Sequence, residues 1–499
     1  MNQETSPAQP SPVSPGIFEV IRKPTLLSRE TLAGIVTALA LIPEVISFSV
    51  VAGVDPKVSL IASVVICLTL SLIGGRPAMV SAAAGSVALV IAPLVHQQGI
   101  AYLLPTVVLA GLLQIALSLS GMTRMMRYIP RSVMTGFVNA LGLLIFYAQV
   151  PHIWGQAPLV WGMFAVTLGI VLLLPRLFSA IPAPLIAIVV ITAAAWSLGY
   201  RVPTVGDEGP MSAGLPGLTQ LQVPLNLHTL AIIWPTAVSV ALVGLIETLL
   251  TAKMVDDLTD THSSKAKEAV GLGIANILAA FYGGIAGCAM IGQTVVNVEL
   301  GKARSRLSTL VAGIVLLLLV SVLSQVMAHI PMVVLAAIMM VVAVKTLNWH
   351  SVRPATLRRL PLSETLIMLA TVVITVSTSN LALGVVSGVV LAILWFARRI
   401  SHVITTEREL SADGKTATYH VRGTLFFASS NDLYEHFDYA TDPSQVIIDL
   451  SSAVVWDTSS VAALDAIEQR YQRYHTQVTL TGLQGPSKSL HQQVSGQLD

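Results

Sequence analysis

Apolar runs close to 20 residues long recur along the chain from about Ser28 to Phe396, separated by short polar or charged loops. A helix of about 20 apolar residues crosses the hydrocarbon core of a bilayer, so this pattern predicts a polytopic α-helical membrane protein. We expect about fourteen crossings, two of them interrupted by glycine. They lie near residues 29–51, 56–74, 78–95, 101–120, 129–150, 158–175, 183–199, 229–255, 266–283, 288–300, 305–326, 330–347, 363–379 and 382–397.

The two interrupted segments are the most informative part of this pattern. Gly74–Val90 reads GGRPAMVSAAAGSVALV, and Gly283–Leu300 reads GGIAGCAMIGQTVVNVEL. Each is too short and too rich in glycine for a single spanning helix, so we expect a few extended residues followed by a half-helix. Paired broken segments point to a transport site, because unwound backbone survives at membrane depth only where it lines a cavity or packs against protein. The free N–H groups of the two half-helices would then face a shared anion.

The two halves of the apolar region repeat each other. Four short matches keep the same order, each pair separated by roughly 200 residues, which indicates an internal repeat. They join Leu41–Glu44 to Gly244–Glu247, Gly74-Gly75 to Gly283-Gly284, Ala110-Gly111 to Ala312-Gly313, and Ile129-Pro130 to Ile330-Pro331. Seven crossings per half is an odd number, so the second half must be inverted relative to the first. This predicts a seven-plus-seven inverted repeat over about residues 29–199 and 229–397.

Charge supports this reading. Only 11% of the 499 residues are charged and 54% are hydrophobic, whereas a soluble domain carries about 25% charged residues. With a cytoplasmic N-terminus, the outer loops keep only Lys57 and Arg201 of the basic residues, so both termini are expected in the cytoplasm. The arginines near 124–131 and 353–359 then read as topology determinants rather than anion sites. The net charge of +2 gives no indication of nucleic-acid binding.

The ends of the chain differ in character from its centre. Residues 1–16 are rich in Pro and Ser and predict a disordered tail, and residues 17–400 form the transmembrane domain. Residues 401–499 alternate predicted strands and helices, which is typical of a small cytoplasmic α/β domain. We place strands at 416–427, 445–450 and 478–483, and helices at 431–440 and 459–475. Asp457 and Ser459 form either a phosphate-binding or phosphorylation spot or a helix cap, and capping is favoured.

Two isolated acids lie within apolar segments. Glu44 lies in ALALIPEVISFSVVAG, and Glu247 lies in VALVGLIETLLTAKM at the corresponding place of the second half. An ionised carboxylate there is costly, so each acid must face a polar cavity, pair, or carry a proton. We favour transport roles over simple helix packing. Glu247 with Thr248 and Thr251 could bind Na⁺ or pass a proton, and the acids without basic partners point to cation-coupled anion uptake, with H⁺ favoured because burial stabilises a neutral acid.

Small residues open both half-helices. They are Ser81, Ala84, Gly85 and Ser86 in the first segment, and Gly292, Gln293 and Thr294 in the second. Small side chains let an oxyanion reach the backbone amides, so we assign these residues to substrate binding, although small residues also make close helix contacts. Phe48 lies one turn from Glu44 and is assigned to the wall of the same pocket, with a lipid-facing or core position as the alternative. We predict buried thiols for Cys67 and Cys288, no disulfide, no metal, no cofactor and no enzymatic activity, because no metal motif or nucleophile–base pair is present.

These residues together resemble the SulP (sulfate permease) family, the bacterial relatives of the solute carrier family 26 anion transporters. The resemblance covers nearly the whole chain. It rests on IPEVISFSVVAGVDP at 42–56, YIPRSVMTGFVNALG at 128–142, GLIETLLTAKMVDD at 244–257, GCAMIGQTVVNVELGKARSRLSTLVAG at 287–313 and, in the tail, VIIDLSSAVVWDTSSVAALD at 446–465. The last of these is similar to the family's STAS domain.

The resemblance implies a core domain of spans 1–4 and 8–11 that moves against a gate domain of spans 5–7 and 12–14. It implies an anion site between the third and tenth spans, and an ion site at Glu247 and Thr251. By this resemblance the substrate position falls on Glu44, Phe48, Ala84, Gly85, Gly292 and Gln293. Homodimers, with STAS domains that contribute to assembly or regulation, are also implied.

The chain departs from the family pattern at the site. Many relatives have Gln in place of Glu44 and Arg in place of Gln293, which disfavours simple chloride or sulfate exchange. The tail has Asp-Thr-Ser-Ser at 457–460 where the family pattern is Asp-Ser-Ser-Gly, which weakens a phosphorylation role for Ser459.

We therefore predict a secondary active anion transporter of a bacterial inner membrane that takes up C4 dicarboxylates such as fumarate with H⁺ by alternating access. The alternatives are Na⁺-coupled bicarbonate or H⁺-coupled sulfate transport, a nucleobase–cation symporter, and a membrane sensor that signals through its STAS domain to a cytoplasmic partner.

Overall fold

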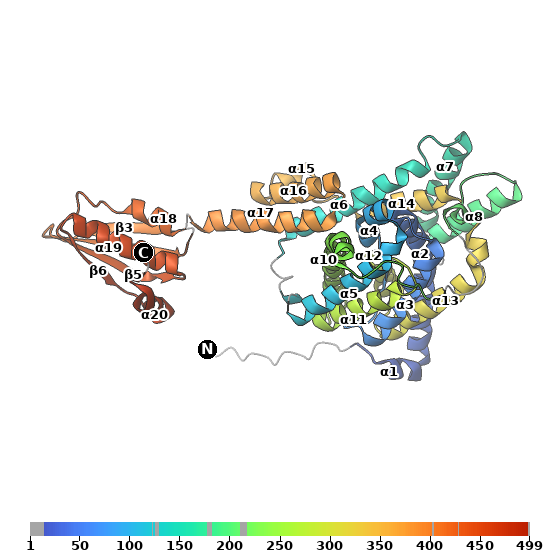
Figure 1. The fold of residues 1–499 in the computed structure, drawn as a ribbon, viewed down its shortest axis with the longest axis horizontal. Coiled ribbons are helices and arrows are strands. Elements are labelled where there is room, and N and C mark those ends of the chain that lie inside the picture. Colours follow the sequence, from blue (N-terminus) through green and yellow to red (C-terminus); the bar gives the residue numbers. More distant parts are fainter. Residues whose placement is uncertain are drawn as a thin grey trace. The chain divides into compact units, whose positions relative to one another are not determined.

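The computed structural model describes residues 14–121, 123–124, 129–176, 182–209, 217–401, 404–427 and 429–497. Most of the predicted tail at 1–16, and part of the arginine cluster near 124–131, therefore lie outside the described residues. The chain divides into two compact units, Met1–Val389 and Val390–Asp499, which are considered separately (Figure 1).

The first unit is almost entirely helical, and every predicted crossing contains a helix (Figure 1). Among the described residues, eight helices are long and apolar enough to cross a membrane, and three shorter apolar helices accompany them. Helix α1 (Ile17–Arg22) precedes the first predicted repeat. The helices of that repeat are α2 (Pro24–Ala52), α3 (Pro56–Ile73), α4 (Gly85–Gln98), α5 (Leu103–Leu119), α6 (Arg131–Gln149), α7 (Pro158–Leu173) and α8 (Ala183–Ser197). After α9 (Val205–Glu208), the second repeat has α10 (Leu227–Thr259), α11 (Lys265–Ala280), α12 (Ile291–Val295), α13 (Arg306–Met327), α14 (Met332–Thr346), α15 (Pro354–Leu357), α16 (Leu362–Thr378) and α17 (Leu381–Ser401).

Local sequence explains where these helices begin. Pro24 and Pro56 occupy the first turns of α2 and α3, where a missing N–H costs nothing. The Asn226, Ser264 and Ser305 side chains each accept a backbone N–H at the start of α10, α11 and α13. These polar caps end the connecting loops and fix where each apolar segment enters its helix.

The helices of the first unit pack in two groups. One group joins α2, α3, α4, α5, α10, α11 and α13 through extensive mutual contacts, and the other joins α6 to α14 and α16, and α7 to α8 and α14. These sets match the spans expected for the core and gate domains. The two broken segments lie inside the first group, with α4 and α12 beside α10 (Figure 1).

The second unit is a small α/β domain. Its sheet has the order β3 (Thr405–Leu410), β4 (Thr416–Leu425), β5 (Gln445–Val455) and β6 (Gln477–Thr481), with β3 antiparallel to β4 and the other neighbours parallel. Helix α19 (Thr458–Arg473) packs on it with Val461, Leu464 and Ile467 buried, and α20 (Gly485–Val494) follows β6. Asp457 caps α19 by accepting from the Ser460 backbone N–H at 3.0 Å, which confirms the capping interpretation.

Four details of this unit differ from the sequence prediction. Strand β5 runs to Val455, five residues beyond its predicted end at 450. Strand β3 and helix α20 were not predicted, and the helix predicted at 431–440 is wrong: α18 spans only Ser430–Leu433, followed by one 3₁₀ turn at Tyr434–His436. The chain leaves the helix there because Phe437 and Tyr439 turn into the core beside Tyr471. Asp442 then anchors the loop by accepting hydrogen bonds from the hydroxyls of Tyr419 (2.7 Å) and Tyr471 (2.6 Å).

Candidate functional site

A two-stranded sheet lies at the centre of the first unit. Strand β1 (Ser81–Ala83) pairs antiparallel with β2 (Gly287–Ala289), with Ala82 opposite Cys288. The Met290 backbone N–H donates to the Val80 carbonyl at 2.8 Å and extends the pairing by one residue. The extended residues expected in each broken segment are thus present, and the two repeats join through them. Each strand runs directly into a half-helix, α4 after β1 and α12 after β2.

Side chains from neighbouring helices satisfy the outer edges of this sheet. On the β2 side, the Asn276 amide brackets Gly287, accepting from its N–H at 2.8 Å and donating to its carbonyl at 3.1 Å. Asn276 also donates to the Gln114 Oε1 at 2.9 Å. On the β1 side, the Ala83 N–H donates to the Ser63 hydroxyl at 3.1 Å. Buried polar backbone must be paired, and these side chains replace the missing strands.

The first half-helix begins against an aromatic ring. Ala84 caps α4 without a side-chain hydrogen bond, and Gly85 is its first residue. A Cβ on Gly85 would lie 2.5 Å from the Phe48 ring, so the glycine is what allows the ring to pack there. Phe48 is only 5% exposed and therefore packs in the core beside α4 rather than facing lipid.

Glu247 of α10 reaches the beginning of α4. Its Oε2 accepts a short hydrogen bond from the Ser86 hydroxyl and a second, at 3.0 Å, from the Cys288 thiol. Glu247, Ser86 and Cys288 are all buried. An acid of the second repeat therefore meets the half-helix of the first repeat, where two side-chain donors hold its carboxyl group.

The threonines near these segments are bonded to backbone. Thr248 accepts from the Ala289 N–H at 3.0 Å, and Thr251 donates to the Glu247 carbonyl at 2.7 Å. Thr294 accepts from the Val80 N–H at 3.0 Å, which ties α12 to the strand of the other repeat. Hydroxyl oxygens keep a free lone pair in such bonds, so Thr248 and Thr251 can still offer an oxygen to a cation.

Glu44 meets the other half-helix. It lies in α2, which stays helical through Pro43, and its carboxyl group lies close enough to the Gln293 side chain of α12 to interact with it. Glu44 is only partly buried, whereas Gln293 is 3% exposed. Helix α12 continues directly into the π-helical turn η5 (Val296–Leu300), so the helical run covers residues 291–300.

The space around this second contact is less filled. Apart from its neighbours in sequence and the backbone of its own helix, no heavy atom of the described chain lies within 4 Å of the position a Cβ would take on Gly292, which is itself exposed. The Gln293 Oε1 and the Ser81 hydroxyl are both buried, and neither has a hydrogen-bond partner in the described chain. Unpaired buried polar atoms beside an open position are what a polar ligand would complete.

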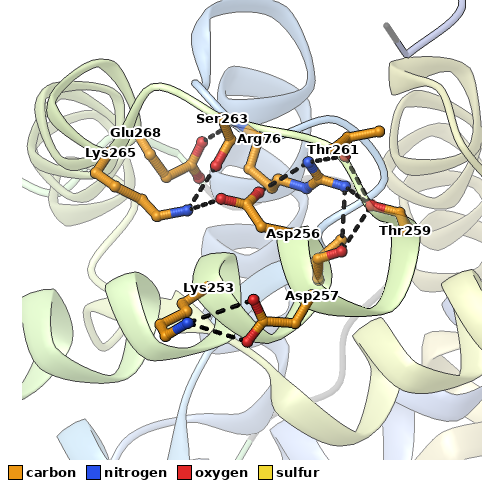
Figure 2. Close-up of polar contacts among 10 residues, drawn as sticks. Arg76, Lys253, Asp256, Asp257, Thr259, Thr261, Ser263, Lys265 and Glu268 are labelled. Carbon is orange, nitrogen blue, oxygen red and sulfur yellow. Dashed lines mark hydrogen bonds and ion pairs between the residues drawn. The ribbon is translucent and has the colours of Figure 1, made fainter. Parts of the chain in front are cut away.

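An ionic cluster lies on the loop that precedes β1 (Figure 2). The Arg76 guanidinium donates to Asp256 at 2.9 Å and to the hydroxyls of Thr259 and Thr261, both at 2.6 Å. The Glu268 carboxylate, also buried, accepts the backbone N–H of Arg76 at 2.8 Å. These contacts fasten the first broken segment to α10 and α11 of the second repeat, so they position the site without facing it.

A separate hollow of about 420 Å³ lies at the beginning of α10. Leu227, Leu230, Ala231 and Trp234 line it. Its lining is apolar and it begins 20 residues before Glu247, which is about 30 Å along a helix. It therefore does not belong to the polar site between the half-helices.

The structure brings most of the predicted residues together around the strand pair. The Glu44 and Glu247 side chains reach opposite half-helices, and Ser81, Ala84, Gly85, Ser86, Gly292 and Gln293 lie at their beginnings. Sequence reasoning missed Cys288 as a partner of Glu247, and it missed Asn276, Gln114 and Ser63 as supports of the strands. Asn276 and Gln114 are isolated amides in apolar helices, a signal that could have revealed them.

Comparisons with known proteins concern the family and the fold of this chain. A model of the sulfate permease family matches residues 27–165 and 157–371, and a STAS domain model matches residues 407–495. YbaR of Bacillus subtilis (strain 168) is 46% identical over 94% of this chain and 97% of its own length. The bicarbonate transporter BicA of Picosynechococcus is 25% identical, over 91% of this chain and 88% of its own length.

Solved structures show the same architecture. The murine solute carrier 26 family member A9 anion transporter in the inward-facing state superposes with a TM-score of 0.81 at 18% identity, over 94% of this chain and 87% of its own. The transmembrane domain of a cyanobacterial BicA superposes with a TM-score of 0.64 at 28% identity, over 71% of this chain and 97% of its own.

Proposed function

This chain belongs to the sulfate permease family and ends in a STAS domain, and from that membership we propose a secondary active transporter that takes up a small carboxylate together with H⁺. Transport proceeds by alternating access, in which the core helices carry the site past the gate helices. The preferred substrates are C4 dicarboxylates such as fumarate.

One observation carries this proposal. The partly accessible Glu44 lies against the Gln293 side chain, next to the open position at Gly292. A carboxylate next to an anion site repels the anion unless a proton or a cation neutralises it. Proton binding to Glu44 therefore favours anion binding, and release of the proton favours release of the anion. This is the linkage that a symporter needs.

The coupling ion is the second part of the proposal. Glu247 already accepts hydrogen bonds from Ser86 and Cys288. These two bonds use lone pairs of its carboxyl group that would otherwise bind Na⁺. Na⁺ usually needs several oxygen ligands at once, which Glu247, Thr248 and Thr251 could supply only after rearrangement. We therefore favour H⁺, with Na⁺ at Glu247 as the alternative.

Bicarbonate is the second candidate substrate. The likeness to BicA along most of both chains favours it, and sulfate is the third candidate because of the family match. All three are oxyanions that accept hydrogen bonds, so backbone and amide N–H groups at Ala84, Gly85 and Gln293 suit each of them.

Uptake into proteoliposomes tests the proposal. Labelled fumarate, bicarbonate and sulfate are offered under an inward H⁺ gradient, an inward Na⁺ gradient, or neither. We expect fumarate to accumulate with the H⁺ gradient. We expect Glu44→Gln to lose this accumulation while keeping part of its anion exchange, because the amide cannot carry the proton. Glu364→Gln, which changes an exposed acid at the beginning of α16, is the matched control. Fumarate uptake that is unchanged by either gradient would contradict the proposed coupling to H⁺ or Na⁺.

The setting of the transporter completes the proposal. We place it in a bacterial inner membrane with both termini in the cytoplasm, as a homodimer whose STAS domain binds a regulatory partner. A reporter fused after residue 499 tests the orientation. The mass of the complex purified in detergent tests the dimer.

A further inference from the structure

Gln293 connects the coupling acid to the anion site. Its side chain lies beside the Glu44 carboxyl group, close enough to interact with it, while its Oε1 is buried without a partner in the described chain. Gly292, the residue before it, faces open space. One end of this amide therefore faces the acid, and the oxygen at the other end has no partner in the described chain.

The hydrogen-bonding rules of the two groups make this arrangement depend on protonation. An ionised carboxylate only accepts hydrogen bonds, so it takes the Nε2–H of Gln293 and leaves the Oε1 for the site. A bare acceptor oxygen repels an anion. A protonated carboxyl group has an O–H to donate, and the group that accepts it is the Oε1. The Nε2–H₂ is then free to donate to an oxyanion.

We propose that the Gln293 amide is a relay that turns by about half a revolution and converts protonation of Glu44 into a hydrogen-bond donor for the anion. The inference rests on the proposed function, since it assumes that an anion binds beside Glu44. The balance is simple: one proton binds the Glu44 carboxylate, stays on it, and is hydrogen-bonded to the Gln293 Oε1. The Nε2–H bond that the carboxylate loses is the one that the anion gains.

Glu44 is the group whose protonation changes in this proposal, because the other charged groups around α2 lie far from it along the helices. Elements packed against α2 carry charged or ionisable side chains only near their ends in the described chain, apart from the Cys67 thiol, which donates to the Thr309 carbonyl. These groups are Glu19 and Arg22 of α1, Lys57 of α3, His96 of α4, Glu299 of η5, Arg306 of α13 and Lys345 of α14. On α2 itself, Glu30 lies 14 residues from Glu44, or about 21 Å along the helix, and accepts the Arg304 and Ser305 backbone N–H groups.

The test measures anion affinity rather than accumulation. Half-saturation of labelled fumarate exchange is determined in proteoliposomes with equal pH on both sides, at about pH 6 and about pH 8. We expect wild-type affinity to fall at the higher pH. We expect Gln293→Met, which keeps the length but removes the amide, to bind about tenfold more weakly at low pH. Its pH dependence should be much smaller than that of the wild type, because only the direct repulsion between the Glu44 carboxylate and the anion remains. Gln293→Arg donates in either state of Glu44, so its affinity should be high at both pH values and should depend less on pH than that of the wild type.

A matched substitution controls for the loss of a buried amide. Gln149→Met changes a glutamine that is 2% exposed at the end of α6 and should keep the wild-type pH dependence. If Gln293→Met folds, transports and still shows the full pH dependence, the relay is wrong while proton coupling stands. If wild-type affinity and gradient-driven accumulation are both independent of pH, then proton coupling is wrong, and the relay, which depends on it, is wrong too. If Gln293→Met fails to fold, Gln293→Arg decides, because a pH dependence as large as that of the wild type in that variant overturns the relay.

Discussion

The two acids of the site sit in related positions but in different surroundings. Glu44 of the first repeat meets α12 of the second, and Glu247 of the second repeat meets α4 of the first. The carboxyl group of Glu247 is buried and held by Ser86 and Cys288. Glu44 is partly accessible, and its partner Gln293 keeps an unpaired oxygen. Each acid thus reaches the half-helix of the other repeat. The contact at Glu247 is closed, because Ser86 and Cys288 hold its carboxyl group, and the contact at Glu44 is open, because the Gln293 oxygen is unpaired.

The same contrast appears at the edges of the central strands. Asn276 brackets both backbone groups of Gly287, whereas Ser63 meets only the N–H of Ala83. Strand β2, which leads into α12 and the open contact at Glu44, is therefore held by more hydrogen bonds than β1, which leads into α4 and the closed contact at Glu247. We infer that a site which binds and releases a ligand needs a rigid support, while a closed contact supports itself.

The largest effect is expected from the strand supports. Asn276→Leu would leave the Gly287 N–H, the Gly287 carbonyl and the Gln114 Oε1 without their partner, at about 1–3 kcal/mol for each buried group. Ser63→Ala removes one acceptor and should cost about a third as much. Thermal unfolding in detergent measures both. Equal losses of stability would contradict the difference between the two edges.

The acid of the closed contact comes next. Glu247→Ala leaves the buried Ser86 hydroxyl and Cys288 thiol unpaired, so we expect about 2–4 kcal/mol of lost stability and little remaining uptake. Glu247→Gln keeps an acceptor oxygen, so its loss of stability should be smaller than that of Glu247→Ala. Thermal unfolding and uptake are measured on the same preparations. A stable Glu247→Ala protein with normal H⁺-driven uptake would show that the contact has no role.

The glycines of the two half-helices give a matched pair. Gly85→Ala forces a Cβ to 2.5 Å from the Phe48 ring, so we expect about 1–3 kcal/mol of destabilisation by overpacking. Gly292→Ala meets no atom within 4 Å and should leave the unfolding midpoint unchanged, but its methyl group narrows the space for the anion and raises the half-saturation concentration. If Gly292→Ala changes stability and not affinity, that space is not the anion site.

The smallest effect is expected at Thr251. Its hydroxyl bonds to the carbonyl of Glu247 in its own helix, so Thr251→Val should cost less than about 1 kcal/mol. With H⁺ as the coupling ion, gradient-driven uptake should stay within about twofold of wild type. Loss of uptake in a stable variant would favour Na⁺ at Glu247, and a Na⁺ gradient should then drive uptake by the wild type.

Much of the helical arrangement could be predicted because its signals are local. Hydrophobic length, Gly-Gly breaks at 74 and 283, and opening prolines determine where the helices lie. The pairing of β1 with β2 could not be predicted, because Ser81–Ala83 and Gly287–Ala289 show no strand pattern and pair only where two distant loops meet. Strand β3 was missed because it is exposed and charged, as edge strands often are.

The crossed contacts of the acids could not be predicted either. Sequence alignment of the repeats places Glu44 opposite Glu247, but the rotation of α2 and α10 about their axes decides which half-helix each acid reaches. That rotation follows from packing over the whole unit. The partnership of Cys288 with Glu247 depends on the same packing, so a buried thiol was all that the sequence indicated.

The exchange of strands and acids between the repeats has a consequence for ancestry. Neither repeat can complete its own pocket, because each supplies the acid for the other's helix and the strand for the other's sheet. A forerunner with one repeat per polypeptide would have worked only as a pair inserted in opposite directions into the same membrane. Within one chain each repeat can change separately, so one acid can be held by buried donors while the other stays accessible.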